Sequence, residues 1–301
     1  MSPKHQPKKQ DGSAELRAAV RDVVSDPVKF SRRLPVRLRD RSVTTLGNVM
    51  SEQQHEVLQV LGSKNRVAIA KARQLGISTI CRAFFVWKAL TTPGYTAGLL
   101  SNKARGAKEI SRIDLRFIQG LELVFGQLIA KKNVNEIVLT NGSRLLYFSG
   151  AAVNDRGYTM DGLHISEFAH VENGADLLAT LLQSVPDNGN VVIESTPSHH
   201  GDPLHKIVQR AAMEAPGASG GWTTVFFPWF TFTLYRAEPG PSCTTPEHGK
   251  WDANQEAWRR NKISELSGDE WRISARMTST TSRPAALKWT RAAWNIGFAL
   301  A

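Results

Sequence analysis

Cysteine is nearly absent from this chain, since Cys81 and Cys243 are the only two among its 301 residues. A disulfide framework and a cysteine-rich zinc site are therefore excluded, and two thiols suit a reducing compartment. No run of about 18 apolar residues occurs, so no membrane span is expected. The first residues are polar and basic without an apolar segment, so no secretory signal is visible.

Acidic residues are also in deficit. The chain carries 38 Lys and Arg against 27 Asp and Glu, which gives a net charge of +11 and an isoelectric point near 9.9. This excess suits a polyanionic partner such as DNA, although a merely basic protein would have the same composition. A length of 301 residues allows one large or two modest domains with a substantial core.

The first 45 residues differ from the rest in composition. Residues 1–13 are rich in Lys, Gln and Pro and are expected to be disordered. A basic cluster follows, and it either contacts DNA or a partner or forms a solvated arm; its members are Arg32, Arg33, Arg37, Arg39 and Arg41. We therefore expect residues 1–45 to form a basic, partly disordered N-terminal arm.

The middle of the chain alternates predicted strands and helices. Apolar spacing predicts a long helix over residues 102–125, whose core face carries Ile110, Ile113, Phe117, Leu121 and Val124. The pair Asn141-Gly142 between two apolar runs predicts a β-hairpin. Other helices are expected at 51–61, 80–90 and 175–185, and strands at 66–70, 95–100, 136–139, 144–148, 162–166 and 191–194. Strands separated by helices imply an α/β fold with a mainly parallel sheet and ligands at the carboxyl ends of the strands.

The segment from Lys71 to Thr79 has the character of a phosphate-binding loop. It lies between a β-branched apolar run and an apolar helical stretch, and unpaired N–H groups at a helix start favour anions. The usual pattern is G-x-x-x-x-G-K-[ST]; here Lys71 replaces the first glycine, Gly76 is the second, and Ile77 occupies the lysine position. Ser78 fits the hydroxyl that coordinates Mg²⁺. The long lysine stem still reaches the phosphates, although a strand, basic turn and helix without a ligand would look similar.

Two later strands end in residues suited to phosphate chemistry. The run Gly162–Phe168 contains Ser166 and Glu167 where nucleotide hydrolases carry an acidic pair, one member holding the metal and the other polarising the attacking water. Only Glu167 is a carboxylate, so we expect weaker metal binding. The strand near residue 193 ends in Ser195 and Thr196, which either sense the γ-phosphate or form a plain turn. These strand ends and the loop could converge on one crevice.

In their order and spacing these motifs resemble the large terminase subunit of tailed bacteriophages, the motor that packages DNA. The resemblance covers roughly residues 45 to 272 and rests on segments 71–79, 156–167, 193–197 and 225–236. It implies a P-loop NTPase fold with a β-hairpin insertion, and ATP and Mg²⁺ as cofactors. The implied domains are the ATPase domain at 46–240, a linker helix region at 241–272 and an atypical tail at 273–301.

The resemblance also implies roles for individual residues. Lys71 would neutralise the β- and γ-phosphates, and Glu167 would activate the attacking water. Arg73 would act as a cis arginine finger or as a conformational switch. Ser78 and Ser166 would hold Mg²⁺, the latter through water. The other implied nucleotide contacts are Gln74, Gly76 and Thr79.

Two further roles follow from the same resemblance. Ser195 and Thr196 would couple the phosphate state to motion against DNA. Gln54, with Gln53 as the alternative, would read the adenine from the helix before the loop, unless it is simply an exposed helix residue. A histidine cluster is turn-like and has no acidic partner at a convincing ligand spacing, so we expect no metal at His199, His200 and His205.

The implied partners are double-stranded DNA, the small terminase subunit and the portal protein or procapsid, with a homo-oligomeric ring during packaging and no membrane. The implied location is the cytoplasm of the bacterial host. Two other interpretations stay open: a helicase-like ATPase and an inactive DNA-binding prophage remnant. In the family a carboxylate-rich nuclease domain follows the ATPase, whereas residues 273–301 contain no Asp or Glu. We therefore expect a truncated chain without nuclease activity.

Overall fold

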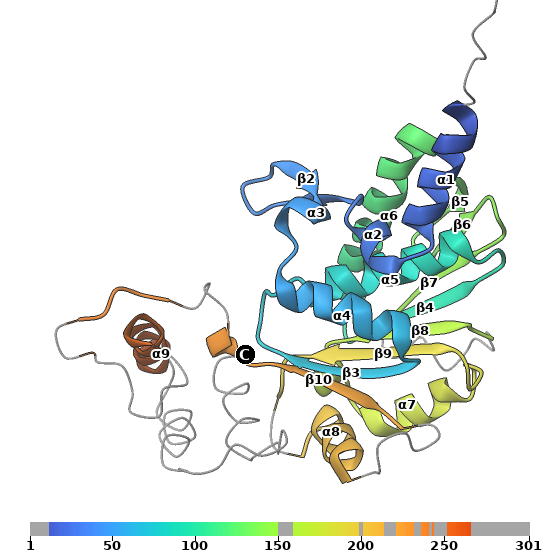
Figure 1. Cartoon of the computed structure of the whole chain (residues 1–301). Helices are drawn as coiled ribbons and strands as arrows, with labels where there is room; N and C mark the ends of the chain where they lie inside the picture. Colours follow the sequence, from blue (N-terminus) through green and yellow to red (C-terminus); the bar gives the residue numbers. More distant parts are fainter. Residues whose placement is uncertain are drawn as a thin grey trace, which may run out of the picture.

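The computed structural model describes residues 12–149, 159–198, 201–213, 221–231, 236–240, 243 and 252–265. Within these ranges the centre is an eight-stranded sheet in the order β10-β3-β9-β8-β4-β7-β6-β5 (Figure 1). Its strands are β3 (Arg66–Lys71), β4 (Thr96–Ser101), β5 (Ile129–Lys132), β6 (Glu136–Leu139), β7 (Arg144–Ser149), β8 (Gly162–Ser166), β9 (Asn190–Ser195) and β10 (Thr223–Phe227). The α/β fold class is confirmed.

Most of this sheet is parallel. Neighbouring strands from β10 through β7 pair in parallel, whereas β6 and β5 continue the edge antiparallel. The expected hairpin joins β6 to β7, and Gly142 adopts a φ of 84° in its turn. Strand β5 was not predicted, because the two lysines that end Ile129–Lys132 are exposed and the strand lacks an alternating apolar pattern.

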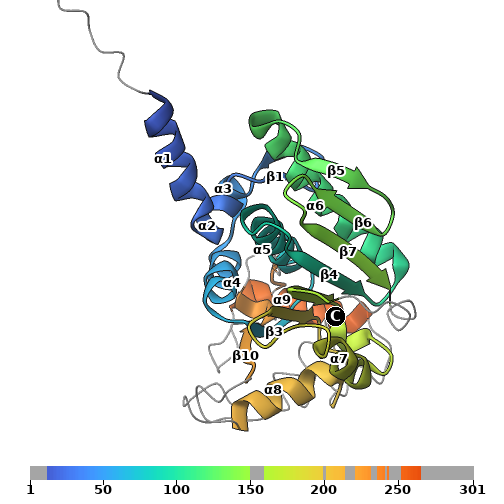
Figure 2. The same cartoon turned by 90° about the vertical axis from the view of Figure 1, so that its right-hand side faces the viewer.

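Helices cover both faces of the sheet (Figures 1 and 2). One face carries α4 (Glu52–Ser63), α5 (Ile77–Thr91) and α6 (Ala104–Phe125), and the other carries α7 (Gly174–Leu182) and α8 (Pro203–Met213). Because side chains alternate along a strand, Val67 and Ile69 pack in the core on the α5 side, whereas Ala68 and Ala70 pack in the core on the α8 side.

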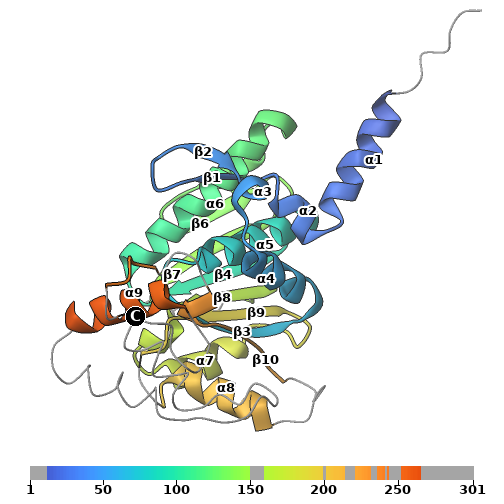
Figure 3. The same ribbon diagram turned by 60° about the vertical axis from the view of Figure 1, so that its left-hand side comes forward.

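The long helix α6 matches its predicted range closely, but one predicted core residue is wrong. Val124 is 76% exposed, and its neighbours Leu123 and Phe125 are exposed as well. The last turn of α6 extends past the packed body (Figure 3), so apolar spacing continues there without a surface to cover. Ile113 is only partly buried.

Part of the N-terminal region, which was expected to form an arm over residues 1–45, packs against the main core. Its elements are α1 (Gly12–Val24), α2 (Pro27–Ser31), β1 (Pro35–Arg37), β2 (Val43–Thr45) and α3 (Leu46–Val49). Helix α1 projects outward (Figure 1), whereas Phe30 and Leu34 are buried in the main core. All five arginines of the basic cluster are exposed. Residues 1–11, within the segment expected to be disordered, lie outside the described residues.

Downstream of the sheet, α9 (Ala253–Glu265) falls within the region expected to hold a linker helix. The atypical tail at 273–301 lies outside the described residues. Among the helices that the structure describes, none combines the length and apolar character needed to cross a bilayer.

Candidate functional site

Polar side chains gather where three adjacent parallel strands end. Lys71 ends β3, Ser166 ends β8, and Ser195 ends β9. In the sheet β9 lies between β3 and β8, and Glu194 of β9 is registered opposite Ser166. The carboxyl ends of adjacent parallel strands meet at one edge, and this arrangement brings Lys71 into contact with Glu194, which lies 123 residues later in the chain.

Lys71 is the central positive charge of this edge. It is 5% exposed, and its Nζ lies 3.1 Å from Oε1 of Glu167 and 3.1 Å from Oε2 of Glu194. Burial alone would lower the pKa of Lys71, but the two carboxylates outweigh burial and raise the pKa above its ordinary value. Lys71 therefore stays protonated.

Glu194 is the site residue that the sequence analysis missed. It is fully buried, and its Oε1 accepts hydrogen bonds of 2.7 Å from Oγ of both Ser78 and Ser166. Burial would raise the pKa of Glu194, but the charge of Lys71 and the surrounding donors hold the pKa below its ordinary value. The available signal was a carboxylate inside an apolar strand, because acidic residues are almost never fully buried unless they are paired.

The loop between β3 and α5 closes through left-handed backbone. Gln74 has a φ of 62° and Gly76 a φ of 68°. Helix α5 starts at Ile77. Ser78 and Thr79 therefore lie in its first turn, whereas the sequence predicted that they belong to the loop. The left-handed φ of Gly76 favours glycine there, and an added Cβ would lie 2.5 Å from Nε2 of Gln54, so that side chain would have to shift. The first turn of α5 lies at the same edge as Lys71, because Oγ of Ser78 contacts Glu194, and unpaired N–H groups at a helix start favour anions.

Two side chains that precede this loop in the sequence form hydrogen bonds with it. Gln54 donates from Nε2 to the carbonyl of Leu75 at 2.8 Å, and its Oε1 accepts from the backbone N of Ser51 at 3.1 Å in a capping box. Both ends of its amide are thus engaged within the chain, and adenine recognition by Gln54 or Gln53 stays a prediction. Arg39, in the turn between β1 and β2, donates to Oε1 of Gln74 at 2.7 Å. Arg73 is exposed in the same loop.

Glu167 follows β8 in a left-handed conformation, with a φ of 57° and a ψ of 44°. Such backbone is uncommon outside glycine and is concentrated at functional sites. Its side chain is 40% exposed, in contrast to the buried Glu194. Oε1 of Glu167 faces Lys71, while Oε2 accepts from Oγ1 of Thr196 at 3.2 Å. Glu167 therefore combines contact with the buried lysine and access for water.

The two residues after Glu194 connect β9 to the short helix η2 (Phe168–His170). Oγ of Ser195 accepts from the backbone N of Ala169 at 3.1 Å and donates to the carbonyl of Thr196 at 2.7 Å. Oγ1 of Thr196 lies 3.1 Å from Nε2 of His170. Ser195 and Thr196 thus tie the end of β9 to the segment that follows Glu167.

The structure brings together six of the residues expected in the site: Lys71, Ser78, Ser166, Glu167, Ser195 and Thr196. His205 is elsewhere; its Nδ1 accepts from the backbone N of Gly201 at 3.0 Å, while His199 and His200 lie outside the described residues. Among the residues that the structure does describe, no group of three or more His, Cys, Asp or Glu is arranged to hold a metal ion.

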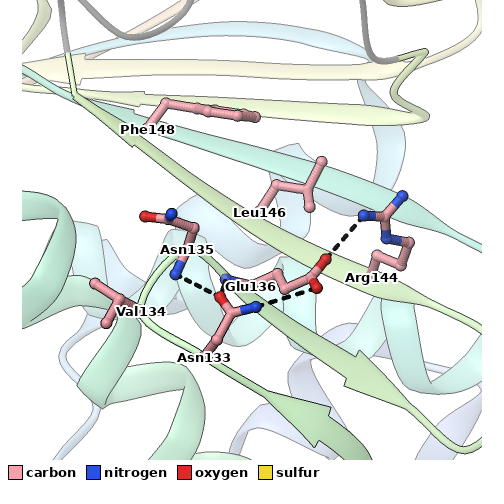
Figure 4. A pocket seen from close by; sticks show the side chains of 7 residues that line it. All are labelled: Asn133, Val134, Asn135, Glu136, Arg144, Leu146 and Phe148. Carbon is pink, nitrogen blue, oxygen red and sulfur yellow. Dashed lines mark hydrogen bonds and ion pairs between the residues drawn. The ribbon is translucent and has the colours of Figure 1, made fainter. Parts of the chain in front are cut away.

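A separate cavity of about 390 Å³ lies beside β6 and β7, near the β5 edge of the sheet (Figure 4). Its one carboxylate belongs to Glu136, which pairs with Arg144 at 2.8 Å and accepts a hydrogen bond from Asn133. The hydrogen bond from Arg144 lowers the pKa of Glu136 below its ordinary value. These groups satisfy one another, and the strand ends that carry Lys71 and Glu167 are not part of this cavity.

Comparison with known proteins identifies the architecture. No protein-family model matches the sequence, and no curated protein matches it. The HK97 bacteriophage large terminase aligns with 81% of this chain at a TM-score of 0.58 and 11% identity, and the alignment covers 52% of that terminase. This chain has the fold of a phage large terminase. It spans about half the length of the HK97 protein.

Two other terminase structures align less closely. The ATPase domain of the Thermus phage P74-26 large terminase has a TM-score of 0.47 and 14% identity, over 60% of this chain and 82% of the domain. The large terminase of a second thermophilic bacteriophage, solved in complex with ADP, aligns at a TM-score of 0.47 and 14% identity. The alignment covers 60% of this chain and 46% of that protein.

Proposed function

We propose that this chain is the ATP-hydrolysing motor domain of a phage or prophage large terminase, which drives double-stranded DNA into the capsid. One observation carries the proposal. A buried lysine, two carboxylates and the start of helix α5 meet at the carboxyl ends of β3, β8 and β9. This is the place where open α/β sheets bind ligands.

The nucleotide phosphates are proposed to lie against the loop and the first turn of α5. Backbone N–H groups there favour negative charge, and Lys71 supplies a positive charge that burial makes effective. Gln74, Gly76, Ser78 and Thr79 complete the phosphate contacts, and Gln54 or Gln53 reads the adenine. In the described structure Lys71 pairs with two carboxylates, so the phosphates would compete with them for its charge.

Hydrolysis needs a group that orients water toward the γ-phosphate. Glu167 fits this role, because its carboxylate is partly exposed and hydrogen-bonded to Thr196, which fixes its direction. Phosphoryl transfer requires little covalent chemistry from the protein, so positioning and charge stabilisation account for most of the rate acceleration. Arg73 acts as an arginine finger in cis or as a conformational switch, and Ser195 and Thr196 couple the phosphate state to motion against DNA.

The oxygen donors at the site suit Mg²⁺. The hydroxyls of Ser78 and Ser166 converge on one carboxylate oxygen at 2.7 Å each, and magnesium prefers oxygen ligands. When bound, Mg²⁺ neutralises charge that develops on the phosphate oxygens.

The proposed partners follow from the motor role and the charge. A net charge of +11 favours double-stranded DNA. The small terminase subunit and the portal protein or procapsid are the protein partners of such a motor, which would assemble as a homo-oligomeric ring in the cytoplasm of the bacterial host.

The test is phosphate release from Mg²⁺-ATP by the purified chain, with and without double-stranded DNA. Glu167→Gln keeps the size of the side chain but removes the charge that orients water, so turnover should fall by about 10²-fold or more while ATP binding persists. Glu172→Gln, at an exposed position in the same segment, is the matched control and should keep turnover.

Each rival function gives a different result in this assay. Unwinding of a forked DNA substrate would identify a helicase. DNA binding without any hydrolysis would identify an inactive remnant, and normal turnover of Glu167→Gln would remove Glu167 from the mechanism.

A further inference from the structure

The acidic strand β8 ends in a serine where nucleotide hydrolases place a metal-positioning carboxylate. In that class of enzyme the phosphate-loop Ser or Thr and an aspartate on the acidic strand hold Mg²⁺ together. Here the strand offers Ser166, which carries no charge. The hydroxyl of Ser78 nevertheless donates to a carboxylate, and that carboxylate comes from the neighbouring strand β9.

We propose that Glu194 supplies the carboxylate that Ser166 does not, so that the magnesium site is completed from β9 instead of β8. The proposal rests on the proposed nucleotide site and names a residue of that site that the sequence motifs did not.

Strand geometry allows this replacement. Side chains two residues apart share a face of a sheet, and Val192 packs in the core on the α5 side, so Glu194 also points toward α5. Ser166 is registered opposite Glu194 on the adjacent strand. A side chain from either strand can therefore reach the first turn of α5, where Ser78 lies. Glu194 is one methylene longer than the aspartate that it would replace.

The contacts of Glu194 exceed those of a counter-ion for Lys71. Lys71 already has Glu167 as a partner at 3.1 Å. Glu194 places Oε2 on Lys71 but directs Oε1 to the hydroxyls of Ser78 and Ser166, at 2.7 Å each. A buried counter-ion also needs hydrogen bonds on its second oxygen, but here both donors are hydroxyls of residues that the proposed function assigns to Mg²⁺. The contact with Ser78 places the negative charge on the hydroxyl that faces the metal in this class of loop.

The buried imidazole of His164 lies beside the Glu194 carboxylate. His164, two residues before Ser166, is fully buried, and its Nε2 lies 3.6 Å from Oε1 of Glu194. Among the described residues neither ring nitrogen has a hydrogen-bond partner. A buried ring nitrogen this close to the carboxylate is placed where an outer contact to a metal ligand would form.

The test is the affinity of Mn²⁺ for the complex of the full chain with a non-hydrolysable ATP analogue, measured by electron paramagnetic resonance. Glu194→Gln should weaken Mn²⁺ binding by about 10- to 100-fold and leave analogue binding without metal unchanged or tighter. Ser166→Asp combined with Glu194→Gln returns the charge to β8 and should restore Mn²⁺ affinity to within a few-fold. Glu172→Gln, at an exposed position, is the control.

Opposite results separate the explanations. If Glu194→Gln keeps Mn²⁺ affinity within about twofold and instead weakens metal-free analogue binding, Glu194 is only a counter-ion of Lys71 and the inference fails. If Glu194→Gln does not fold, Glu194→Asp keeps the charge and should bind Mn²⁺ nearly as the native chain does; a loss as large as that expected for Gln would also overturn the inference. If the native chain binds no analogue, the proposed function itself fails.

Discussion

At the residue scale, Lys71 occupies a different position from the lysine of the usual phosphate-loop motif. Lys71 is the last residue of β3 and not the residue before Ser78, where the usual motif has its lysine. That usual position holds Ile77, which is 1% exposed and belongs to the main core. The structure thus gives the two positions opposite surroundings, one among carboxylates and one among apolar side chains.

This contrast predicts the effects of two substitutions. Lys71→Ala should weaken binding of a fluorescent ATP analogue by roughly 10- to 100-fold, because hydrogen bonds to charged groups contribute about 1.5–3 kcal/mol. Ile77→Val should leave the affinity unchanged and lower the free energy of unfolding by about 0.5–1.5 kcal/mol through lost packing. Parallel titrations and urea melts measure both quantities. Loss of affinity in Ile77→Val, with Lys71→Ala unaffected, would show that the loop is wrongly placed.

At the element scale, a buried ion pair joins α5 to α6. Arg82 of α5 donates to Asp114 of α6 through Nε and Nη2, and Nη2 lies 2.5 Å from Oδ2. The hydroxyl of Tyr147 on β7 donates to the same Oδ2 at 2.7 Å. Arg82 and Asp114 are both fully buried. One carboxylate therefore links two helices and a strand on the α5 face of the sheet.

Removal of this carboxylate should be costly. Asp114→Ala leaves the Arg82 charge buried without its partner, so the free energy of unfolding should fall by about 3–5 kcal/mol. Glu109→Ala is the matched control on the same helix, because Glu109 pairs with Arg112 and both side chains are more than half exposed; the expected change is about 0–1 kcal/mol. Urea unfolding measures both. Equal losses in the two variants would contradict a structural role for the buried pair.

The elements that could be predicted from sequence are those with their own local pattern. The apolar β-branched run before Lys71, the amphipathic period of α6 and the Asn141-Gly142 turn each determine their structure within a few residues. Strand β5 has no such pattern, and the last turn of α6 has the pattern without a packing partner. Glu194 could not be assigned, because its role depends on β9 lying between β3 and β8. Strand order is a property of the whole sheet, and no local period records it.

At the scale of the whole molecule, the excess positive charge lies partly in the exposed cluster around β1 and β2. Arg39 of that cluster contacts the loop between β3 and α5 through Gln74, whereas Arg33 and Arg37 are exposed. If the cluster contacts DNA, replacing Arg33 and Arg37 by Gln should reduce double-stranded DNA affinity. It should also lower the slope of log affinity against log salt by about one per lost phosphate contact.

Fluorescence anisotropy over a range of salt concentrations measures that slope, and ATP-analogue affinity serves as the internal control because neither arginine contacts the loop in the described structure. An unchanged slope would show that the cluster is a solvated arm and that DNA binds to another part of the molecule.

The central claim is that ATP binds where β3, β8 and β9 end. The most direct measurement is a crystal structure of the chain grown with Mg²⁺ and a non-hydrolysable ATP analogue. The account predicts phosphate density against the loop and first turn of α5, with Lys71 on the β- and γ-phosphates and Glu167 facing the γ-phosphate. Density for the nucleotide in the cavity beside β6 and β7, or anywhere away from these strand ends, would contradict it.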